Sequence, residues 1–444
     1  MEWTGRSGAW PAWPIRFFVV ALFVPWLFDL NGLIISPYRL VLLAMVLPCL
    51  FRWLNGAAGR FRVADFCLLF YCLWAAISMA VRDGVGSAVE GGGILFVETM
   101  GAHLLARCFV RSARDYYNVA LLFFRCILLL MPFAVFEALT GNNILLEASR
   151  ALVTTHYAVP DTRWGLTRVQ SVLEHPILFG VVVGSALAPA HLVLGYGQGI
   201  VKRYFRSSVV ALTAFLSMSS GPLTALFVQI VLLTWNGMLA SVKERWKLFW
   251  AAMFAGYTLV AIASNQSVFQ FAITYFSFSP TNAYFRVLIW NHGSASALNH
   301  PVFGTGMEDW ERPAWMPPSI DMFWLYHAIV YGIPAAVAML AAFLSVFLAV
   351  SLRPAAADPK LMAYRLAYLA SMASLFCVGW TVHFWNATFV LFLFTLGGGV
   401  WLLEAEEPAM RERGPRPVRG RITRSPRPVT ENRRARPTNG PASS

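Results

Sequence analysis

MFWLYHAIVYGIPAAVAMLAAFLSVFLAV, residues 322–350, has no charged side chain and is long enough to cross a lipid bilayer. A helix crosses the hydrocarbon core with roughly 17–25 mostly apolar residues, and such stretches recur along the chain. We predict about twelve spans, at 17–34, 38–54, 64–81, 93–110, 117–137, 176–196, 208–220, 222–240, 247–264, 322–350, 361–381 and 386–403. The mean hydropathy of +0.58 also differs from that of soluble proteins. The sequence therefore predicts an all-α polytopic membrane protein.

One pair of predicted spans is separated by very few residues. The segments 208–220 and 222–240 meet at Ser219-Ser220-Gly221-Pro222, a sequence that suits a turn. If the chain did not turn there, the pair would be one kinked helix and every later segment would face the opposite side of the membrane. The distribution of basic residues distinguishes these two possibilities.

Basic residues gather on one side of the predicted spans, as they do in cytoplasmic segments. That side carries Arg6, Arg16, Arg52, Arg60, Arg62, Arg107, Arg111, Arg114, Lys202, Arg203, Arg206, Lys243, Arg245, Lys247, Arg353, Lys360 and Arg365. The other side carries only Arg39, Arg82, Arg150, Arg163, Arg168, Arg286 and Arg312. The pattern continues through the pair at 208–240, which indicates two separate helices. Both termini are then cytoplasmic, and two long polar loops, 138–174 and 266–320, are external.

The chain thus divides into three regions: an N-terminal segment at 1–16, a membrane domain at 17–404 and a basic tail at 405–444. The tail contains ten Arg and four Glu, is rich in Pro and has little to bury, so we expect it to be disordered. It suits either a topology anchor that touches anionic lipid or a docking tail for a cytoplasmic partner. The net charge of +13 comes from the basic residues on the predicted cytoplasmic side and from the tail, so it does not indicate nucleic-acid binding.

The sequence lacks the signature motifs of several functional classes. The six cysteines lie within or at the ends of apolar segments, which predicts neither a disulfide framework nor a zinc site. A phosphate-binding loop, a D-x-D pair and an H-E-x-x-H motif are absent. We therefore expect no metal and no cofactor, and ATP-driven transport within this chain is unexpected.

The first long loop carries residues suited to an anionic ligand. Arg163 and Arg168 precede Glu174 and His175, which stand just before an apolar segment. A guanidinium group donates paired hydrogen bonds to phosphate oxygens. The alternative is an ordinary solvated loop whose arginines meet lipid headgroups.

The second long loop has a similar composition. It contains Arg286, Trp290, His300 and the pair Gly304-x-Gly306, and Asp321 follows it at the start of an apolar helix. Asp321 suits a helix N-cap, a reactive carboxylate, or both. Asp29 and Glu98 fall in the outer halves of their predicted helices, where either one could pair with Arg39.

In this order the residues resemble a bacterial family. The pattern is Arg163-x-Gly165-x-x-Arg168, Glu174-His175-Pro176, Arg286-x-x-x-Trp290, His300-Pro301-x-x-Gly304-x-Gly306, Asp321 and Tyr331-Gly332. It is similar to the O-antigen polymerase and O-antigen ligase superfamily of inner-membrane proteins. The resemblance implies a metal-independent glycosyltransferase of the inner (cytoplasmic) membrane. Such proteins move glycan from undecaprenyl diphosphate to an acceptor at the periplasmic face.

Two departures from the family pattern favour a polymerase over a ligase. Many members have a Ser-Arg pair where this chain has Ser219-Ser220-Gly221-Pro222, and ligases tend to have a histidine near the position of Asp321. This chain has His327, almost two turns further along the helix. The sequence around Asp321 looks more like that of exopolysaccharide polymerases. The partners of these proteins include lipid-linked repeat units and, in some cases, a chain-length regulator.

The chemistry assigns roles to these residues. Glycosyl transfer from a diphosphate needs neutralisation of the leaving group and a base for the attacking hydroxyl. The candidates for neutralisation are Arg286, Arg163 and Arg168, and those for the base are Asp321, Glu174 and His175. His300 and Trp290 are further candidates for substrate binding.

Two other functions stay open. A ligase would transfer the finished glycan to lipid A-core. A flippase or exporter of lipid-linked glycan would tend towards short external loops, a polar path through the helices and internal repeats. The long external loops favour the polymerase. A neighbouring flippase, chain-length regulator and outer-membrane exporter in the genome would do so as well.

The charge pattern makes a direct prediction about topology. A reporter fused after Asn265 should be active in the periplasm, and one fused after Arg353 in the cytoplasm, because the basic segments stay inside. Alkaline phosphatase and green fluorescent protein fusions measure the two compartments. The reverse result at either position would contradict the topology.

Overall fold

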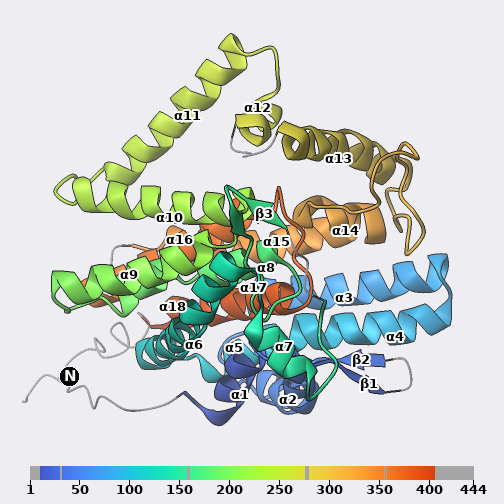
Figure 1. The fold of residues 1–444 in the computed structure, drawn as a ribbon, viewed down its shortest axis with the longest axis horizontal. Helices are drawn as coiled ribbons and strands as arrows, with labels where there is room; N and C mark the ends of the chain where they lie inside the picture. Colours follow the sequence, from blue (N-terminus) through green and yellow to red (C-terminus); the bar gives the residue numbers. More distant parts are fainter. Residues whose placement is uncertain are drawn as a thin grey trace, which may run out of the picture. The chain divides into compact units, whose positions relative to one another are not determined.

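The computed structural model describes residues 11–30, 33–157, 161–275, 280–354, 356 and 358–405 (Figure 1). These residues are mostly helical and contain two short antiparallel hairpins, so the all-α class is confirmed. The predicted tail lies outside the described residues, apart from Ala405, and so do residues 1–10 of the predicted N-terminal segment.

The elements follow each other in a simple order. The first part comprises α1 (Trp13–Ala21), β1 (Phe28–Leu30), β2 (Leu33–Ile35), α2 (Pro37–Leu54), α3 (Val63–Arg82), α4 (Val85–Phe96), the π-helix η1 (Val97–Gly101), α5 (Ala102–Phe109), α6 (Ala113–Thr140), α7 (Ile144–Arg150), β3 (Thr162–Arg163), β4 (Leu166–Thr167), α8 (Pro176–Gly184) and the π-helix η2 (Pro189–Val193). The second part comprises α9 (Ile200–Phe215), α10 (Ser220–Met238), α11 (Arg245–Ala263), α12 (Val268–Tyr275), α13 (Pro280–Asn299), α14 (Phe323–Tyr331), α15 (Ile333–Ser351), α16 (Pro359–Val378), α17 (Ala387–Gly398) and α18 (Trp401–Glu404). β1 pairs with β2, and β3 with β4.

Within the described ranges, nine helices are long and apolar enough to cross a membrane. They are Pro37–Leu54, Val63–Arg82, Ala113–Thr140, Pro176–Val193, Ser220–Met238, Arg245–Ala263, Ile333–Ser351, Pro359–Val378 and Ala387–Glu404. Each overlaps one of the twelve predicted segments. Multiple apolar helices indicate a multi-pass membrane protein, although the predicted number of spans is not reproduced.

The three other predicted segments have different structures. In 17–34, α1 ends at Ala21 and the chain then forms the β1–β2 hairpin, because Pro25 cannot continue a helix. The segment 93–110 belongs to a helical run through α4, η1 and α5 that carries Glu98, His103 and Arg107. In place of 208–220, α9 covers Ile200–Phe215 and begins among basic residues.

The separation of α9 from α10 is as predicted. α9 ends at Phe215 and α10 begins at Ser220, so residues 216–219 turn the chain between two helices that contact each other. Gly180 of α8 faces this turn, and a Cβ there would lie 2.3 Å from Ser217 Oγ. Only glycine permits this close approach.

The predicted span 322–350 is interrupted. α14 ends at Tyr331 and α15 begins at Ile333, with Gly332 between them at φ +89°. A Cβ at Gly332 would lie 2.1 Å from the carbonyl oxygen of Val302. Backbone N–H groups of Thr305 and Gly306 donate to the carbonyls of Ile329 and Val330, at 2.8 and 3.0 Å. The segment after α13 therefore caps the end of α14.

The two polar segments are more structured than loops. Residues 266–320 contain α12 and the 20-residue helix α13, so they do not form one long loop. Residues 138–174 contain α7 and the β3–β4 hairpin. Apolar side chains of α13, including Ile289, pack with Leu325 and Ile329 of α14, which explains why this polar-looking segment is an ordered helix.

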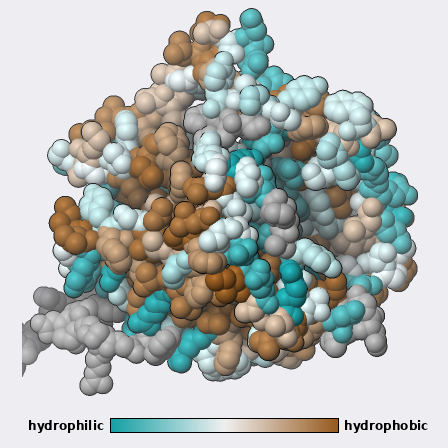
Figure 2. All heavy atoms as spheres, viewed as in Figure 1, coloured by the Kyte–Doolittle hydropathy of each residue, from teal (hydrophilic) through white to brown (hydrophobic). Residues whose placement is uncertain are grey.

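The helices differ greatly in how deeply they are enclosed. In the span Ala387–Glu404, 89% of the residues are buried, whereas Arg245–Ala263 has no buried residue. α17 packs against α5 and α8, α3 packs against α4 and α15, and α10 packs against α16 (Figure 1). An apolar helix with no buried residue suits contact with lipid. Figure 2 shows hydrophilic residues along the edge where α3 meets α4 and the chain leaves α13.

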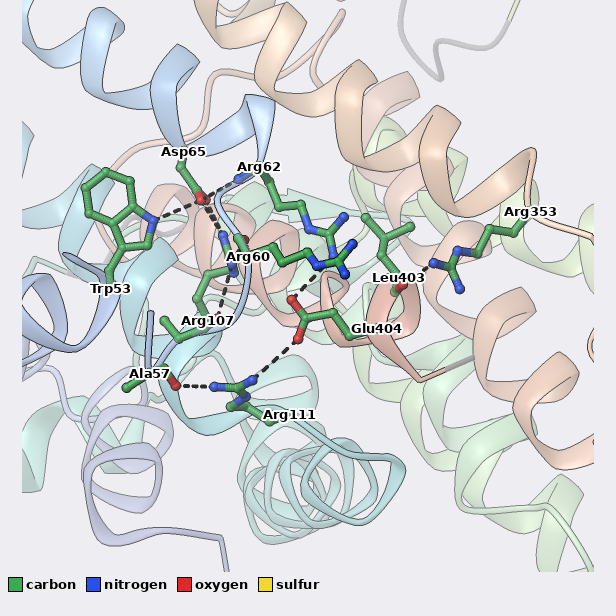
Figure 3. Close-up of polar contacts among 11 residues, drawn as sticks. Trp53, Ala57, Arg60, Arg62, Asp65, Arg107, Arg111, Arg353, Leu403 and Glu404 are labelled. Atoms are coloured by element: carbon green, nitrogen blue, oxygen red, sulfur yellow. Dashed lines mark hydrogen bonds and ion pairs between the residues drawn. The ribbon is translucent and has the colours of Figure 1, made fainter. Parts of the chain in front are cut away.

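Polar contacts join the helix ends predicted to share a side. Asp65 accepts from Trp53 Nε1 at 3.0 Å and from Arg107 Nη1 at 2.5 Å, and Arg62 and Arg111 lie 3.4 and 3.5 Å from the Glu404 carboxylate (Figure 3). At ends predicted to lie on the other side, Arg82 and Glu308 are 3.1 Å apart, and Asp83 accepts from Met307 N. The helix ends that contact each other are thus ones that the charge pattern assigns to the same side of the membrane.

Gly332 provides a test of the break between α14 and α15. Gly332→Ala should lower the midpoint of thermal unfolding in detergent, because alanine is strained at positive φ and its Cβ meets a carbonyl oxygen. Gly237→Ala in α10 is the matched control, since no atom lies within 4 Å of its Cβ position. Equal midpoints for Gly332→Ala and the wild type would contradict this account.

Candidate functional site

The β3–β4 hairpin places two of the predicted arginines. Trp164 and Gly165 form its two-residue loop with φ of 52° and 78°, the positive values that a tight hairpin turn requires. Arg163 stands at the end of β3, and Arg168 follows β4. The chain after the hairpin is anchored as well, because Val169 N donates to the Leu216 carbonyl at 3.0 Å. Both arginines therefore lie beside the turn between α9 and α10.

Arg168 holds this turn in place. Its Nε donates to the Ser217 carbonyl at 3.4 Å and its Nη2 to Ser219 Oγ, while its Nη1 pairs with Asp161. All three guanidinium nitrogens are thus engaged, and the side chain is 7% exposed. We infer that Arg168 positions the 217–220 turn.

Arg163 reaches the same turn from the hairpin. Its Nη1 donates to the Met218 carbonyl at 3.0 Å. Burial lowers the pKa of the Arg163 guanidinium, the neighbouring charge of Arg168 lowers it further, and Asp161 opposes these effects. Two like charges therefore stand close together at one backbone turn.

Arg286 approaches the turn from α13, far away in the sequence. It is buried, and its Nη1 donates to Ser220 Oγ at 3.1 Å, at the first residue of α10. Burial lowers the pKa of Arg286, the carboxylate of Asp321 opposes this shift, and the charge of Arg163 adds to it. We call Arg163, Arg168, Arg286, Asp161 and Asp321 the arginine cluster.

Asp321 joins the arginine cluster from the end of the second polar segment. α14 begins at Phe323 with Met322 as its N-cap and without a side-chain cap bond, so Asp321 does not cap this helix. Burial raises the pKa of Asp321, whereas the Arg286 charge and a hydrogen bond with Ser319 lower it, and the net shift is upward. An elevated pKa beside a cation suits a group that exchanges a proton.

His175 has a structural position. Its Nδ1 accepts from Ile177 N at 3.2 Å, so His175 caps the N-terminus of α8. Burial, helped by the Arg168 charge and opposed by Asp161, lowers the pKa of His175 to about 4. The ring is neutral at pH 7, and with Nδ1 accepting, the proton lies on Nε2. This geometry favours a helix cap over a general base.

Glu174 belongs to a second group of polar residues. It lies 3.3 Å from His156 Nε2, and burial raises its pKa to about 6, with Asn386 and Arg39 opposing that shift. Arg39 Nε in turn pairs with Glu98 at 2.7 Å, which confirms one of the two predicted partners of Arg39.

The remaining predicted residues are separated from the arginines to different degrees. Trp290 lies one turn after Arg286 on α13, and its ring packs against Phe269 at 4.5 Å between ring centroids. His300 lies beyond the other end of α13 and contacts Glu311 at 3.0 Å. Fourteen residues of helix place it about 21 Å from Arg286 along the axis. The structure therefore does not bring His300 into the arginine cluster.

Sequence reasoning missed Ser220, Asp161 and Asn386. Ser220 belongs to the Ser219-Ser220-Gly221-Pro222 sequence recognised as a turn, but nothing local indicated that Arg286 would reach it. In the part of the chain that the structure describes, there is no group of three or more His, Cys, Asp or Glu residues that could hold a metal. What the cluster can do chemically is bind an anion at the N-terminus of α10, where helix dipole and guanidinium groups act together.

Comparison with known proteins adds no identification, because the sequence matches no family model and no curated protein.

The two roles of His175 can be separated by mutation. His175→Asn should leave the free energy of unfolding nearly unchanged, because asparagine also caps helices. His175→Ala should lower it by about 0.5–2 kcal/mol, the usual value of an N-cap. Chemical denaturation in mixed micelles measures both, and His292→Ala on α13 controls for loss of an imidazole. Equal losses in the Asn and Ala variants would contradict the cap.

Proposed function

We propose that this protein polymerises undecaprenyl-diphosphate-linked oligosaccharide repeat units into an exopolysaccharide or O-antigen-type polymer. The reaction would take place at the periplasmic face of a bacterial inner membrane, with both termini in the cytoplasm. The observation that carries this proposal is the convergence of Arg286 and Arg163 on the start of α10, with Asp321 close enough to Arg286 to influence its pKa. The resemblance in sequence supplies the class of substrate.

The arginine cluster suits a diphosphate leaving group. Arg163 and Arg286 belong to the two different polar segments, and the positive end of the α10 dipole lies beside them. Bidentate guanidinium contacts would neutralise charge that grows on the leaving oxygen. The turn lacks the arginine of the family pattern, but these arginines bring guanidinium groups to the same place. Arg168 acts as a positioning residue.

Asp321 is the proposed base. Its carboxylate accepts the proton of the acceptor hydroxyl as that oxygen bonds to the anomeric carbon. The bond from the same carbon to the diphosphate oxygen breaks, and undecaprenyl diphosphate leaves with the bonding electrons. Displacement in line inverts the anomeric centre. The raised pKa of Asp321 makes the carboxylate a stronger base than an exposed aspartate would be.

Substitutions in the arginine cluster test the function. Arg286→Ala should abolish polymer and cause single lipid-linked repeat units to accumulate, and Arg286→Lys should restore little, since a point charge lacks the guanidinium fork. Asp321→Asn should reduce the polymerisation rate roughly a hundredfold or more, as expected for a general base. Gel analysis of polymer and chromatography of lipid-linked glycan, in cells with this chain as their sole polymerase, measure these effects.

Arg312→Ala and Asp309→Asn are the matched controls. They remove the same residue types from an ion pair of 2.6 Å on the same polar segment, in which Asp309 is exposed and Arg312 is partly buried. Polymer of normal length and yield in Arg286→Ala, with the protein at its normal level in the membrane, would overturn the proposal. Normal polymer with loss of glycan from lipid A-core would instead indicate a ligase.

A further inference from the structure

A cavity of about 410 Å³ lies outside the arginine cluster. Its walls come from α3, α4, η1 and α14, and from residues 383–386 before α17. Its volume falls within the range of about 300–1,000 Å³ that is typical of small-molecule sites. Met307 also lines it, and the N–H of Met307 donates to Asp83 at the end of α3. The cavity therefore opens near the helix ends predicted to be external.

Two histidines in the cavity wall have unsatisfied nitrogens. His327 Nε2 and His383 Nδ1 are buried, and neither has a hydrogen-bond partner among the described residues. The other nitrogen of His327 is held by Tyr71 OH at 3.0 Å, which fixes the ring. Buried polar atoms normally have a partner. Both atoms have almost no accessible surface, so a ligand with hydrogen-bonding groups reaches them only when the surrounding side chains shift.

The remaining wall combines aromatic rings with polar groups. The Tyr326 ring is tilted by 31° against that of His383 at 4.0 Å between centroids, and the Trp385 ring lies 5.8 Å from the His383 ring. Glu98 and Asn386 line the cavity as well, and both are held by Arg39. The described lining residues include no Lys or Arg. This composition suits a ligand with hydroxyl groups and apolar C–H faces, and it offers no cation for a phosphate.

The cavity and the arginine cluster adjoin the same short segments. Trp385 lines the cavity, and its ring lies 6.4 Å from that of His175, whose pKa responds to the charge of Arg168. Tyr326 of the cavity wall is only five residues after Asp321. A molecule that fills the cavity could therefore extend towards the proposed base.

We propose that this cavity binds neutral sugar rings of the acceptor glycan and directs one hydroxyl towards Asp321. The direction towards Asp321 rests on the proposed function, whereas the binding of sugar rings rests on the cavity alone. His327 and His383 hydrogen-bond hydroxyl groups, and Tyr326 and Trp385 contact ring faces. The acceptor is thus recognised through its sugars, while the donor is recognised through its diphosphate.

A binding measurement tests this proposal. The probe is the neutral oligosaccharide that mild acid releases from the lipid-linked glycan of the host, which carries neither lipid nor phosphate. The full chain in lipid nanodiscs should bind it in saturation-transfer NMR. His383→Phe should weaken binding about tenfold, because loss of hydrogen bonds worth about 1.5 kcal/mol has that effect. Ile94→Trp should also weaken it, since the larger ring fills the cavity from α4.

The controls introduce the same side chains elsewhere. Val89→Trp lies on α4 at a position that is 73% exposed and outside the lining, and His292→Phe lies on α13. Both should bind like the wild type, and the thermal midpoint of each variant confirms folding. Arg286→Ala should bind the probe normally, because the cavity does not include it.

Three results would overturn the proposal: no binding by the wild type at millimolar probe, unchanged binding in both His383→Phe and Ile94→Trp, or equal losses in the controls. Failure of the proposed function looks different. If Arg286→Ala makes normal polymer while the cavity variants lose the probe, the sugar site stands and the polymerase proposal falls.

Discussion

The structure depends on satisfying backbone polar groups wherever a helix is interrupted among apolar neighbours. Such groups have no water to bond with in an apolar setting, so a break needs partners from the protein. At the turn after α9, the carbonyls of Ser217 and Met218 accept from Arg168 and Arg163. At the end of α14, the carbonyls of Ile329 and Val330 accept from backbone N–H groups of the segment after α13. Each break is thus completed by a polar segment from elsewhere in the chain.

This requirement also assembles the candidate site. The hairpin that carries Arg163 and Arg168 must lie at the turn in order to satisfy it, and the α13 segment packs on α14, which brings Arg286 to Ser220. Like charges then stand together: burial and the charge of Arg168 lower the pKa of the partly buried Arg163, and burial and the charge of Arg163 lower the pKa of the buried Arg286. An anionic ligand would relieve this repulsion, so the same geometry that completes the fold favours anion binding.

Two neighbouring regions offer different chemistry. The arginine cluster has guanidinium groups and a helix N-terminus, whereas the cavity has aromatic rings, neutral imidazoles and no cation among its described lining residues. Burial lowers the pKa of His383 to about 3, so its ring is neutral and presents both a donor and an acceptor. The segment containing Trp385, together with His175, lies between the two regions. A substrate with a charged end and a sugar end would match this division.

The sequence by itself determined the class of the protein, because length and apolarity suffice to predict membrane helices. It also indicated the turn between α9 and α10, and it gave Glu98 as one of two possible partners of Arg39. It identified most residues of the arginine cluster by type, but not their convergence, since Arg163 and Arg286 are distant in the chain. Only the tertiary structure decided that Gly332 interrupts an apolar stretch, that α13 is a helix, and that His175 is a cap. The first two features depend on contacts between remote segments, which local patterns do not encode, whereas the cap is a local bond from Ile177 N that the residue type alone does not reveal.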